Sequence, residues 1–196
     1  VTGLRLGEVV GLRWCDIDFY TNMLHVNQTL NRLQRYDDDE ADSKTEIVAQ
    51  TPKSQNSIRS IPMLPDLVMD LQNWRTVQMQ DAAALGSAYC ENGLIATQEN
   101  GLYVEPRLMR EYYQKMLAAA NLPNYNFHAL RHTFATRAME QGMGAKTLSI
   151  LLGHYSVGFT LDTYAHVLTD QKWTAMQTMA NMYNMEPPLR QPIQFF

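Results

Sequence analysis

The chain has 196 residues, of which 45% are hydrophobic and 18% charged, an ordinary globular balance that suits one domain with a real core. Its formal net charge is −4, but five acidic residues lie together in Asp37–Asp42, so the rest of the chain is net positive by one charge. The acidity of the whole chain therefore does not exclude a nucleic-acid partner. No apolar run approaches the roughly 18 residues of a membrane helix, so we expect no membrane partner and a cytoplasmic protein.

Two other features describe the chain as a whole. Cys15 and Cys90 lack CxxC spacing, and we expect two buried free thiols in a reducing compartment. The chain opens on Val1, and "VTGLRLGEVVGLRW" has the pattern of a helix already under way. We therefore expect a portion of a longer protein whose beginning is missing.

The first third of the chain predicts one helix and a small sheet. Helical spacing runs over Leu4–Leu12, and the alternation in "MLHVNQTL" predicts a strand from Met23 toward Tyr36. After the acidic loop 37–42, "TEIVAQTPKSQNSIRSIPM" predicts two strands joined by a hairpin turn at "KSQNS". Together these segments predict three antiparallel strands.

From Pro65 onward the pattern is helical. The first of these helices has Leu67, Leu71, Trp74 and Gln78 on one face. Five more helices are predicted, at Glu105–Ala120, Phe127–Gly142, Ala145–Leu152, Val157–Tyr164 and Asp170–Tyr183. The predicted fold class is mainly α with a small antiparallel three-stranded β-sheet. It forms one domain over residues 1–184, followed by an extended Pro-rich tail over residues 185–196.

The segment "NFHALRHTFATRAMEQGM" places two histidines and an arginine close together on one predicted helix. At about 100° per residue, four apolar residues form the stripe that we expect to be buried: Phe127, Leu130, Phe134 and Ala138. Arg131 lies at the edge of that stripe, with His128 one turn before it. No acidic residue at i±3 or i±4 can pair with this half-buried guanidinium. Its partner is either a carboxylate distant in sequence or a phosphate from outside.

Zinc is a third ligand that this helix could hold. His128 and His132 have i, i+4 spacing, and His154 could be a further ligand. However, the zinc-protease motif needs a glutamate beside its first histidine, where this chain has Ala129. A cation beside Arg131 would also be repelled. We expect no metal and no cofactor.

Four motifs in order resemble the tyrosine recombinase (phage integrase) family: "TGLRLGE", "HALRHTFAT", "LLGH" and "TLDTYAHV". The resemblance covers nearly the whole chain, as the C-terminal catalytic domain of that family. It implies the mostly helical tyrosine recombinase/integrase catalytic-domain fold with a small three-stranded sheet, in agreement with the pattern of the residues. It also implies a second DNA-binding domain upstream of Val1.

The resemblance places the family's functional positions on seven residues of this chain: Arg5, Glu8, Lys53, His128, Arg131, His154 and Tyr164. It implies that Arg5 and Arg131 grip the scissile phosphate and that Tyr164 is the nucleophile. Two fixed guanidiniums stabilise the charge of the transition state, a task that metal ions perform in other phosphoryl-transfer enzymes. Attack by the phenol leaves a covalent 3′-phosphotyrosine, which stores the bond energy, so rejoining needs no ATP.

The resemblance implies that the remaining residues transfer protons, bind the phosphate or hold the other side chains of the site in place. A free phenol has a pKa of about 10, so Tyr164 needs help, and His128 is the candidate proton acceptor. Lys53 is the candidate general acid for the departing 5′-oxygen. His154 would donate a hydrogen bond to a non-bridging oxygen, and Glu8 would order the site.

Several neighbouring residues have a plainer interpretation. We expect His132 and His166 to be structural. We expect Arg59, Arg137 and Lys146 to be ordinary solvated charges, in contact at most with DNA backbone.

The function that these residues predict is a site-specific DNA recombinase or integrase, with integration or excision of a mobile element as its use. The partners are double-stranded DNA and further copies of the chain, as a tetramer on DNA, with residues 184–196 packed on a neighbouring protomer. Two alternatives are type IB topoisomerase-like DNA relaxation and a catalytically silent DNA-binding relative.

Overall fold

The computed structural model describes residues 2–34, 45–51, 55–164, 176–179 and 182. The acidic loop 37–42, Lys53, His166 and the tail 185–196 lie outside the described residues. Of the predicted helix Asp170–Tyr183, residues 176–179 and 182 are described and are helical. Within the described part of the chain, no helix is both long and apolar enough to cross a membrane.

Helices make up most of the regular secondary structure among the described residues, which confirms the predicted fold class. Their bounds are α1 (Leu6–Val10), α2 (Pro65–Leu85), α3 (Pro106–Ala119), α4 (His128–Glu140), α5 (Ala145–Leu152) and α6 (Val157–Thr163). Most of these bounds lie within two residues of the predicted ones. The first helix is shorter than the predicted Leu4–Leu12 by two residues at each end, and Gly11 ends α1 after little more than one turn.

The strands form two small antiparallel sheets where the sequence predicted one. The strands are β1 (Ile17–Asp18), β2 (Met23–Val26), β3 (Thr29–Gln34), β4 (Thr45–Gln50) and β5 (Arg59–Pro62). One sheet has the order β1-β2-β5, and β3 pairs with β4 in the other. The predicted first strand therefore divides into β2 and β3. The predicted hairpin between the last two strands is wrong, since β4 and β5 pair with different partners.

Side-chain hydrogen bonds explain why that strand divides. Between β2 and β3, the Gln28 amide donates to the Gly11 carbonyl over 2.7 Å, and the Asn27 amide donates to Asp16 over 3.0 Å. These bonds tie the chain to the turn after α1. They direct β3 away from the first sheet, where its own pairing with β4 begins.

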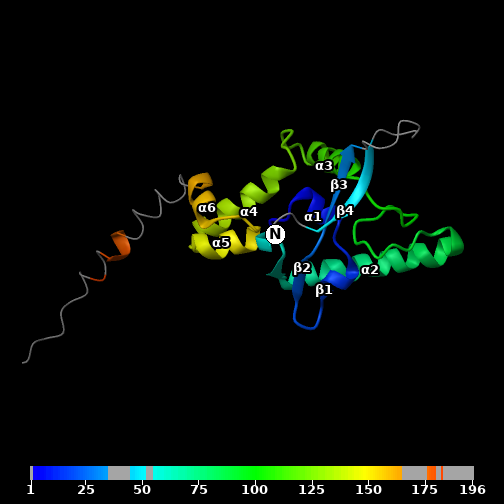
Figure 1. The fold of residues 1–196 in the computed structure, drawn as a ribbon, viewed down its shortest axis with the longest axis horizontal. Helices are drawn as coiled ribbons and strands as arrows, with labels where there is room; N and C mark the ends of the chain where they lie inside the picture. The colour runs from blue at the N-terminus through cyan, green and yellow to red at the C-terminus, as the bar shows by residue number, and fades with distance from the viewer. Residues whose placement is uncertain (1, 35–44, 52–54, 165–175, 180–181, 183–196) are drawn as a thin grey trace, which may run out of the picture.

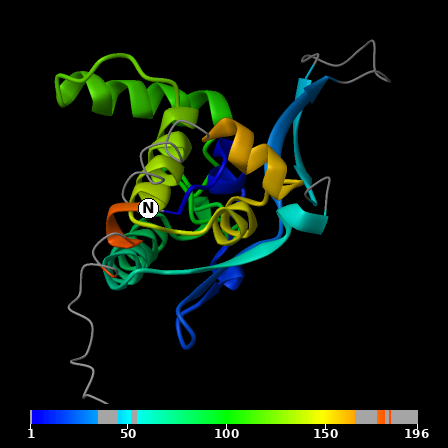
Figure 2. The ribbon, with the colours of Figure 1, turned by 90° about the vertical axis from the view of Figure 1, so that its left-hand side faces the viewer.

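The described residues form two hydrophobic clusters. Figure 1 shows the helices of the smaller cluster, α4, α5 and α6, on the other side of α1 from most of α2. The larger lies between the first sheet and α2, and includes Leu24, Val26 and Ile61. The smaller lies among α4, α5 and α6, and includes Met139 and Leu148. Figure 2 shows these three helices packed together as a unit in front of the sheets. The N-terminal segment before α1 contacts both groups, since Leu4 belongs to the larger cluster and the Gly3 carbonyl accepts a hydrogen bond from Arg131 of α4.

The buried face of α4 differs from the predicted one. Arg131, Ala135 and Met139 are buried, whereas Leu130, expected inside, is 50% exposed. The buried face is rotated by roughly 100° from the stripe predicted on the helical wheel. The prediction centred the buried face of α4 on its largest apolar side chains. In the structure, α4 instead packs its small and charged residues against α5 and the N-terminal segment.

The expectation of buried cysteines is also wrong. Cys15 and Cys90 are both free thiols and both exposed. Cys15 lies in a 3-10 turn (η1, Trp14–Asp16) whose Asp16 is the buried member, and Cys90 lies in the loop after α2.

Gly153, directly after α5, has a left-handed backbone with φ of +64°. A Cβ there would also lie 3.0 Å from Arg59 Nη1 and from the Asn56 carbonyl oxygen. Gly142, after α4, has φ of +85° but open space around it. We therefore expect Gly142→Ala to lower the free energy of unfolding by about 1 kcal/mol through its backbone alone. Crowding should add about 1–3 kcal/mol to this loss in Gly153→Ala.

Denaturant unfolding of the two glycine variants measures this difference. Equal losses would show that the space around Gly153 is not tight.

Candidate active site

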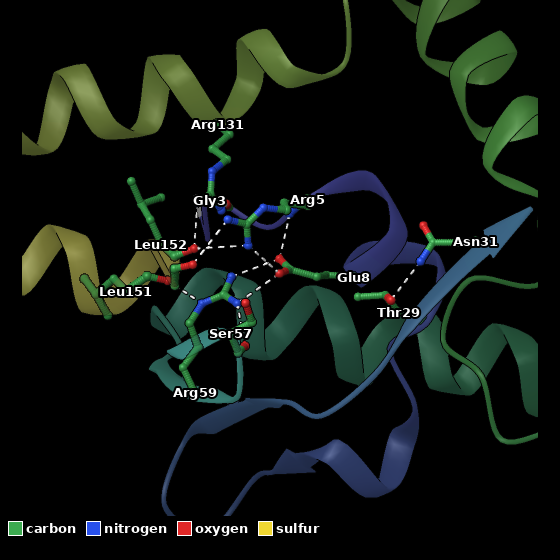
Figure 3. Close-up of polar contacts among 11 residues, drawn as sticks. Gly3, Arg5, Glu8, Thr29, Asn31, Ser57, Arg59, Arg131, Leu151 and Leu152 are labelled. Carbon is green, nitrogen blue, oxygen red and sulfur yellow. Dashed lines mark hydrogen bonds and ion pairs between the residues drawn. The ribbon is translucent and has the colours of Figure 1, made fainter. Parts of the chain in front are cut away.

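Three arginines from different segments meet at the C-terminus of α5: Arg5, Arg59 and Arg131 (Figure 3). The last carbonyls of a helix have no partner within the helix. Here the carbonyls of Leu151 and Leu152 accept hydrogen bonds from guanidinium groups, as does the carbonyl of Gly153. Cations are also favoured at this end of a helix by its dipole. The end of α5 therefore gathers positive charge in one place.

Arg131 reaches this point from the buried face of α4 and is 2% exposed. Its guanidinium donates to the Gly3 carbonyl over 2.8 Å and to the Leu152 carbonyl over 2.6 Å. Burial, with the charge of Arg5 nearby, lowers the pKa of Arg131 to about 10, so the group stays charged at neutral pH. The sequence predicted a carboxylate or a phosphate as its partner, and the contacts in the structure are to neutral carbonyls.

Arg5 is held by the residue three positions after it. The backbone N–H of Arg5 donates to Glu8 Oε2 over 2.8 Å, and its guanidinium donates to Glu8 Oε1 over 3.0 Å. The first of these bonds is the backbone half of a capping box, in which an acidic side chain caps the start of its own helix. The Arg5 side chain is 40% exposed, so it reaches the surface that buried Arg131 does not.

Arg59 is the other partner of Glu8, and the expectation that it is a solvated charge is wrong. Arg59 is 7% exposed and forms two hydrogen bonds to the carboxylate of Glu8, of 3.0 and 2.9 Å. It also donates to the carbonyls of Leu151 and Ser57. The sequence did carry a signal for this burial. Arg59 alternates with exposed positions in step with Ile61, and so lies on the core face of β5.

The cluster carries surplus positive charge. Glu8 is 2% exposed, and burial alone would raise the pKa of its carboxyl, but the hydrogen bonds and charges of Arg59 and Arg5 hold that pKa below its usual value. One carboxylate thus faces three guanidiniums. Such a cluster attracts an anion in which several oxygens can accept hydrogen bonds.

His154 follows Gly153 and lies at the edge of this cluster. It is 8% exposed, and its Nδ1 lies 2.7 Å from the hydroxyl of Thr160 in α6. Burial and the charge of Arg131 lower the pKa of His154 to about 4, so the ring is neutral at neutral pH.

His128 begins α4 on the open side of the cluster. Its ring is exposed and meets the ring of His132 edge-on, with centroids 4.7 Å apart. Partial burial and the neighbouring charges of His132 and Arg131 lower the pKa of His128.

Tyr164 directly follows α6 and packs into the smaller hydrophobic cluster, 3% exposed. Its hydroxyl lies 3.3 Å from Nδ1 of His132. Burial raises the pKa of Tyr164, although the charge of Arg131 acts in the opposite direction. His132, expected to be structural, is thus the histidine that contacts the predicted nucleophile.

The structure brings five of the seven predicted residues into one region, and a sixth, Tyr164, against its edge. These five are Arg5, Glu8, His128, Arg131 and His154. The seventh, Lys53, lies outside the described residues. Among the described residues, no three His, Cys, Asp or Glu side chains are grouped to hold a metal ion.

A family model described as the phage integrase family matches residues 1–171. The chain therefore belongs to the phage integrase family, that is, to the tyrosine recombinases. It is 36% identical over 185 residues to "Tyrosine recombinase XerC-like" of Caldanaerobacter subterraneus subsp. tengcongensis, covering 93% of this chain and 47% of the relative. It is 26% identical to "Transposase from transposon Tn916" of Enterococcus faecalis, covering 91% of this chain and 43% of that one.

Solved structures show the same fold. A variant of the Tn1549 transposon integrase, solved in complex with transposon right end DNA, is 26% identical with a TM-score of 0.69, over 91% of this chain and 56% of that chain. XerA recombinase is 19% identical with a TM-score of 0.60, over 87% of this chain and 54% of that chain. The chain spans about half the length of the curated relatives it matches.

Removing Arg59 should destabilise the fold, because Arg59→Met leaves the buried Glu8 without two of its hydrogen bonds. Breaking a buried ion pair in this way costs about 3–5 kcal/mol. Arg107→Met is the matched control, since its pair with Glu111 is exposed and should contribute about 0.5 kcal/mol or less. Chemical denaturation of both variants checks the difference, and similar losses would contradict the burial of the Arg59–Glu8 pair.

The neutral state of His154 makes stability depend on pH. The pKa of His154 is about 4 in the fold, below the ordinary value of about 6.5, so protons favour the unfolded chain. Its contribution should be fully present above about pH 6.5 and should fall as the pH drops toward 4, by at most about 3 kcal/mol.

The variant His154→Asn isolates this contribution, because asparagine can still bond to Thr160 but does not titrate. Its free energy of unfolding should change less between pH 7 and pH 4.5 than that of the unaltered protein. Parallel pH curves would show that His154 is not held neutral.

Proposed function

We propose that this chain is the catalytic part of a site-specific DNA recombinase that breaks and rejoins strands through a covalent phosphotyrosine at Tyr164. One observation carries the proposal. Three guanidiniums meet one carboxylate at the end of α5, and two of them, Arg5 and Arg131, are the arginines that the sequence motifs predicted to hold the scissile phosphate.

The hydrogen bonds of the cluster leave donors for a phosphate. A guanidinium has five N–H donors. The contacts of Arg131 with Gly3 and Leu152 occupy two of them, and these contacts fix the plane of the group before any substrate arrives. Because Arg5 is more exposed, the two arginines would meet a phosphate from different depths. Losing one such fixed donor typically slows a reaction about 10²–10³-fold.

His154 would add a neutral donor. The hydroxyl of Thr160 can donate to Nδ1 of His154, which places the ring proton on Nε2. In that tautomer, Nε2–H would be free to donate to a non-bridging phosphate oxygen. The low pKa of His154 keeps its ring neutral at neutral pH, so that Nδ1 can accept a hydrogen bond while Nε2 carries the proton.

Two hollows of the surface flank the arginine cluster and could take the strand on either side of the scissile phosphate. One, of about 530 Å³, is lined by His128 together with Arg110 and Gln114. The other, of about 330 Å³, is lined by His154 together with Arg59 and Lys146. Polar and basic side chains in both suit a sugar–phosphate backbone.

The proposal extends to the parts that the described residues do not contain. Lys53 would be the general acid for the 5′-oxygen, and residues 1–184 would form the catalytic domain, with a DNA-binding domain upstream. The substrate would be duplex DNA in the cytoplasm, held by a tetramer in which residues 184–196 pack on a neighbouring protomer. Relatives described as transposases and as "ICEBs1 integrase" support a use in moving a mobile element.

Covalent trapping tests the nucleophile. The full-length protein containing this chain is incubated with a pool of randomised, nicked DNA duplexes, and adducts that survive SDS are isolated. We expect the adduct to map to Tyr164 and to fall at least about 10³-fold in Tyr164→Phe, because phenylalanine has no oxygen to attack phosphorus.

Tyr20→Phe is the control, since Tyr20 is 96% exposed at the turn between β1 and β2, away from the cluster. An adduct that persists in Tyr164→Phe would overturn the assignment of the nucleophile. Relaxation of supercoiled DNA without any exchange of strands would favour a topoisomerase-like activity instead.

A further inference from the structure

The hydroxyl of Tyr164 faces one histidine, and it is not the one that the sequence suggested. Oη of Tyr164 lies 3.3 Å from Nδ1 of His132, and the two rings meet at an angle of 60° with centroids 6.0 Å apart. His132 lies on the second turn of α4, and Tyr164 caps the end of α6. Packing of α4 against the end of α6 therefore brings the two together.

A buried phenol needs a neighbour that can take its proton. Tyr164 is 3% exposed, so water has little access to its hydroxyl. Its burial also opposes formation of a phenolate. A base in direct contact avoids a free phenolate, because the proton can leave as the oxygen attacks.

The other two histidines of the site are less well placed for this task. Nδ1 of His154 is occupied by the hydroxyl of Thr160, and the charges of three arginines around the ring disfavour a proton there. His128 contacts the ring of His132, and His132 in turn contacts the ring of Tyr164. His128 is therefore one residue further from the phenol than His132 is.

His132 also has a route to solvent. Its side chain is exposed, and it lines an open hollow with Ala129, Thr133 and Thr136. With the ring proton on Nε2, Nδ1 can accept the phenol proton while Nε2–H can pass a proton to water.

We propose that His132 is a catalytic residue that accepts the proton of Tyr164 as the phenol attacks DNA. The inference rests on the proposed recombinase function. In the step, the O–H bond of Tyr164 breaks and its proton moves to Nδ1 of His132, while Oη bonds to phosphorus. The bond from phosphorus to the 5′-oxygen breaks, and that oxygen leaves with a proton from a general acid, for which Lys53 is the candidate. Rejoining runs the same transfers backward.

The variant His132→Asn tests the proposal, since asparagine can accept a hydrogen bond near the position of Nδ1 but cannot take a proton. The full-length protein is assayed on a nicked duplex selected by covalent trapping. We expect DNA binding within about threefold of the unaltered protein and cleavage slower by about 10²–10³-fold. Added imidazole should restore part of the rate through the open hollow, whereas Tyr164→Phe should show no rescue.

A second substrate separates a base from an acid. When sulfur replaces the bridging 5′-oxygen, the leaving group departs without a proton. On this substrate, cleavage by His132→Asn should stay as far below the rate of the unaltered protein as it is on ordinary DNA. Cleavage by Lys53→Ala should instead approach the rate of the unaltered protein, because no general acid is needed.

The outcomes separate this inference from the function on which it rests. If the unaltered protein forms no covalent adduct with any DNA, the recombinase function fails, and the role of His132 fails with it. If the unaltered protein forms the adduct, three results overturn the role of His132 alone: cleavage by His132→Asn at the unaltered rate, recovery of this variant on the sulfur substrate, or slow cleavage that imidazole does not raise.

Discussion

The carbonyl oxygens at the end of α5 are the constraint on which the site depends. A helix of eight residues leaves half of its carbonyls without partners inside the helix. In most proteins glycine caps, water or a lysine satisfy such groups. Here Gly153 provides the turn, and guanidiniums from the N-terminal segment, from β5 and from α4 provide the donors. One short helix end thus fixes, relative to one another, three side chains that lie 54 to 126 residues apart in the sequence.

This arrangement explains how a site can hold like charges together before a substrate arrives. Three buried or half-buried guanidiniums repel one another, and one carboxylate, Glu8, offsets only part of that repulsion. The carbonyl dipoles of α5 offset more without neutralising the group. A full set of carboxylates would have neutralised the cluster and left it no surplus charge to attract an anion. Preorganised charge of this kind stabilises a transition state because no dipole has to move during the reaction.

Much of the fold and most of the site could be predicted from the sequence, and the misses have identifiable causes. The bounds of α3, α5 and α6 follow from the helical periodicity of apolar residues and from proline and glycine residues near helix ends, which are local signals. Strand pairing is not local. The separation of β3 from β2 depends on where the amides of Asn27 and Gln28 find partners, and no pattern in the strand itself contains that information. The burial of Arg59 could have been predicted, because Arg59 and Ile61 alternate with exposed residues along β5. It was missed because a charged side chain was expected to be exposed. The contact between His132 and Tyr164 could not have been predicted, because it depends on how α4 packs against α6.

Adjacent residues of α5 belong to different hydrophobic clusters. Leu151 packs against the cluster beneath the first sheet, while Leu152 is part of the one formed by α4, α5 and α6. Parts of a protein open locally with their own free energies, and a smaller cluster has less apolar burial to oppose opening. Among the described residues, the α4–α6 cluster is the smaller, and it alone carries Arg131, His132 and Tyr164 into the site. If these helices detach from the rest, the arginine cluster comes apart while the sheets stay folded. The arginine cluster is therefore no more resistant to heat than the docking of these three helices, which can open at a lower temperature than the sheets.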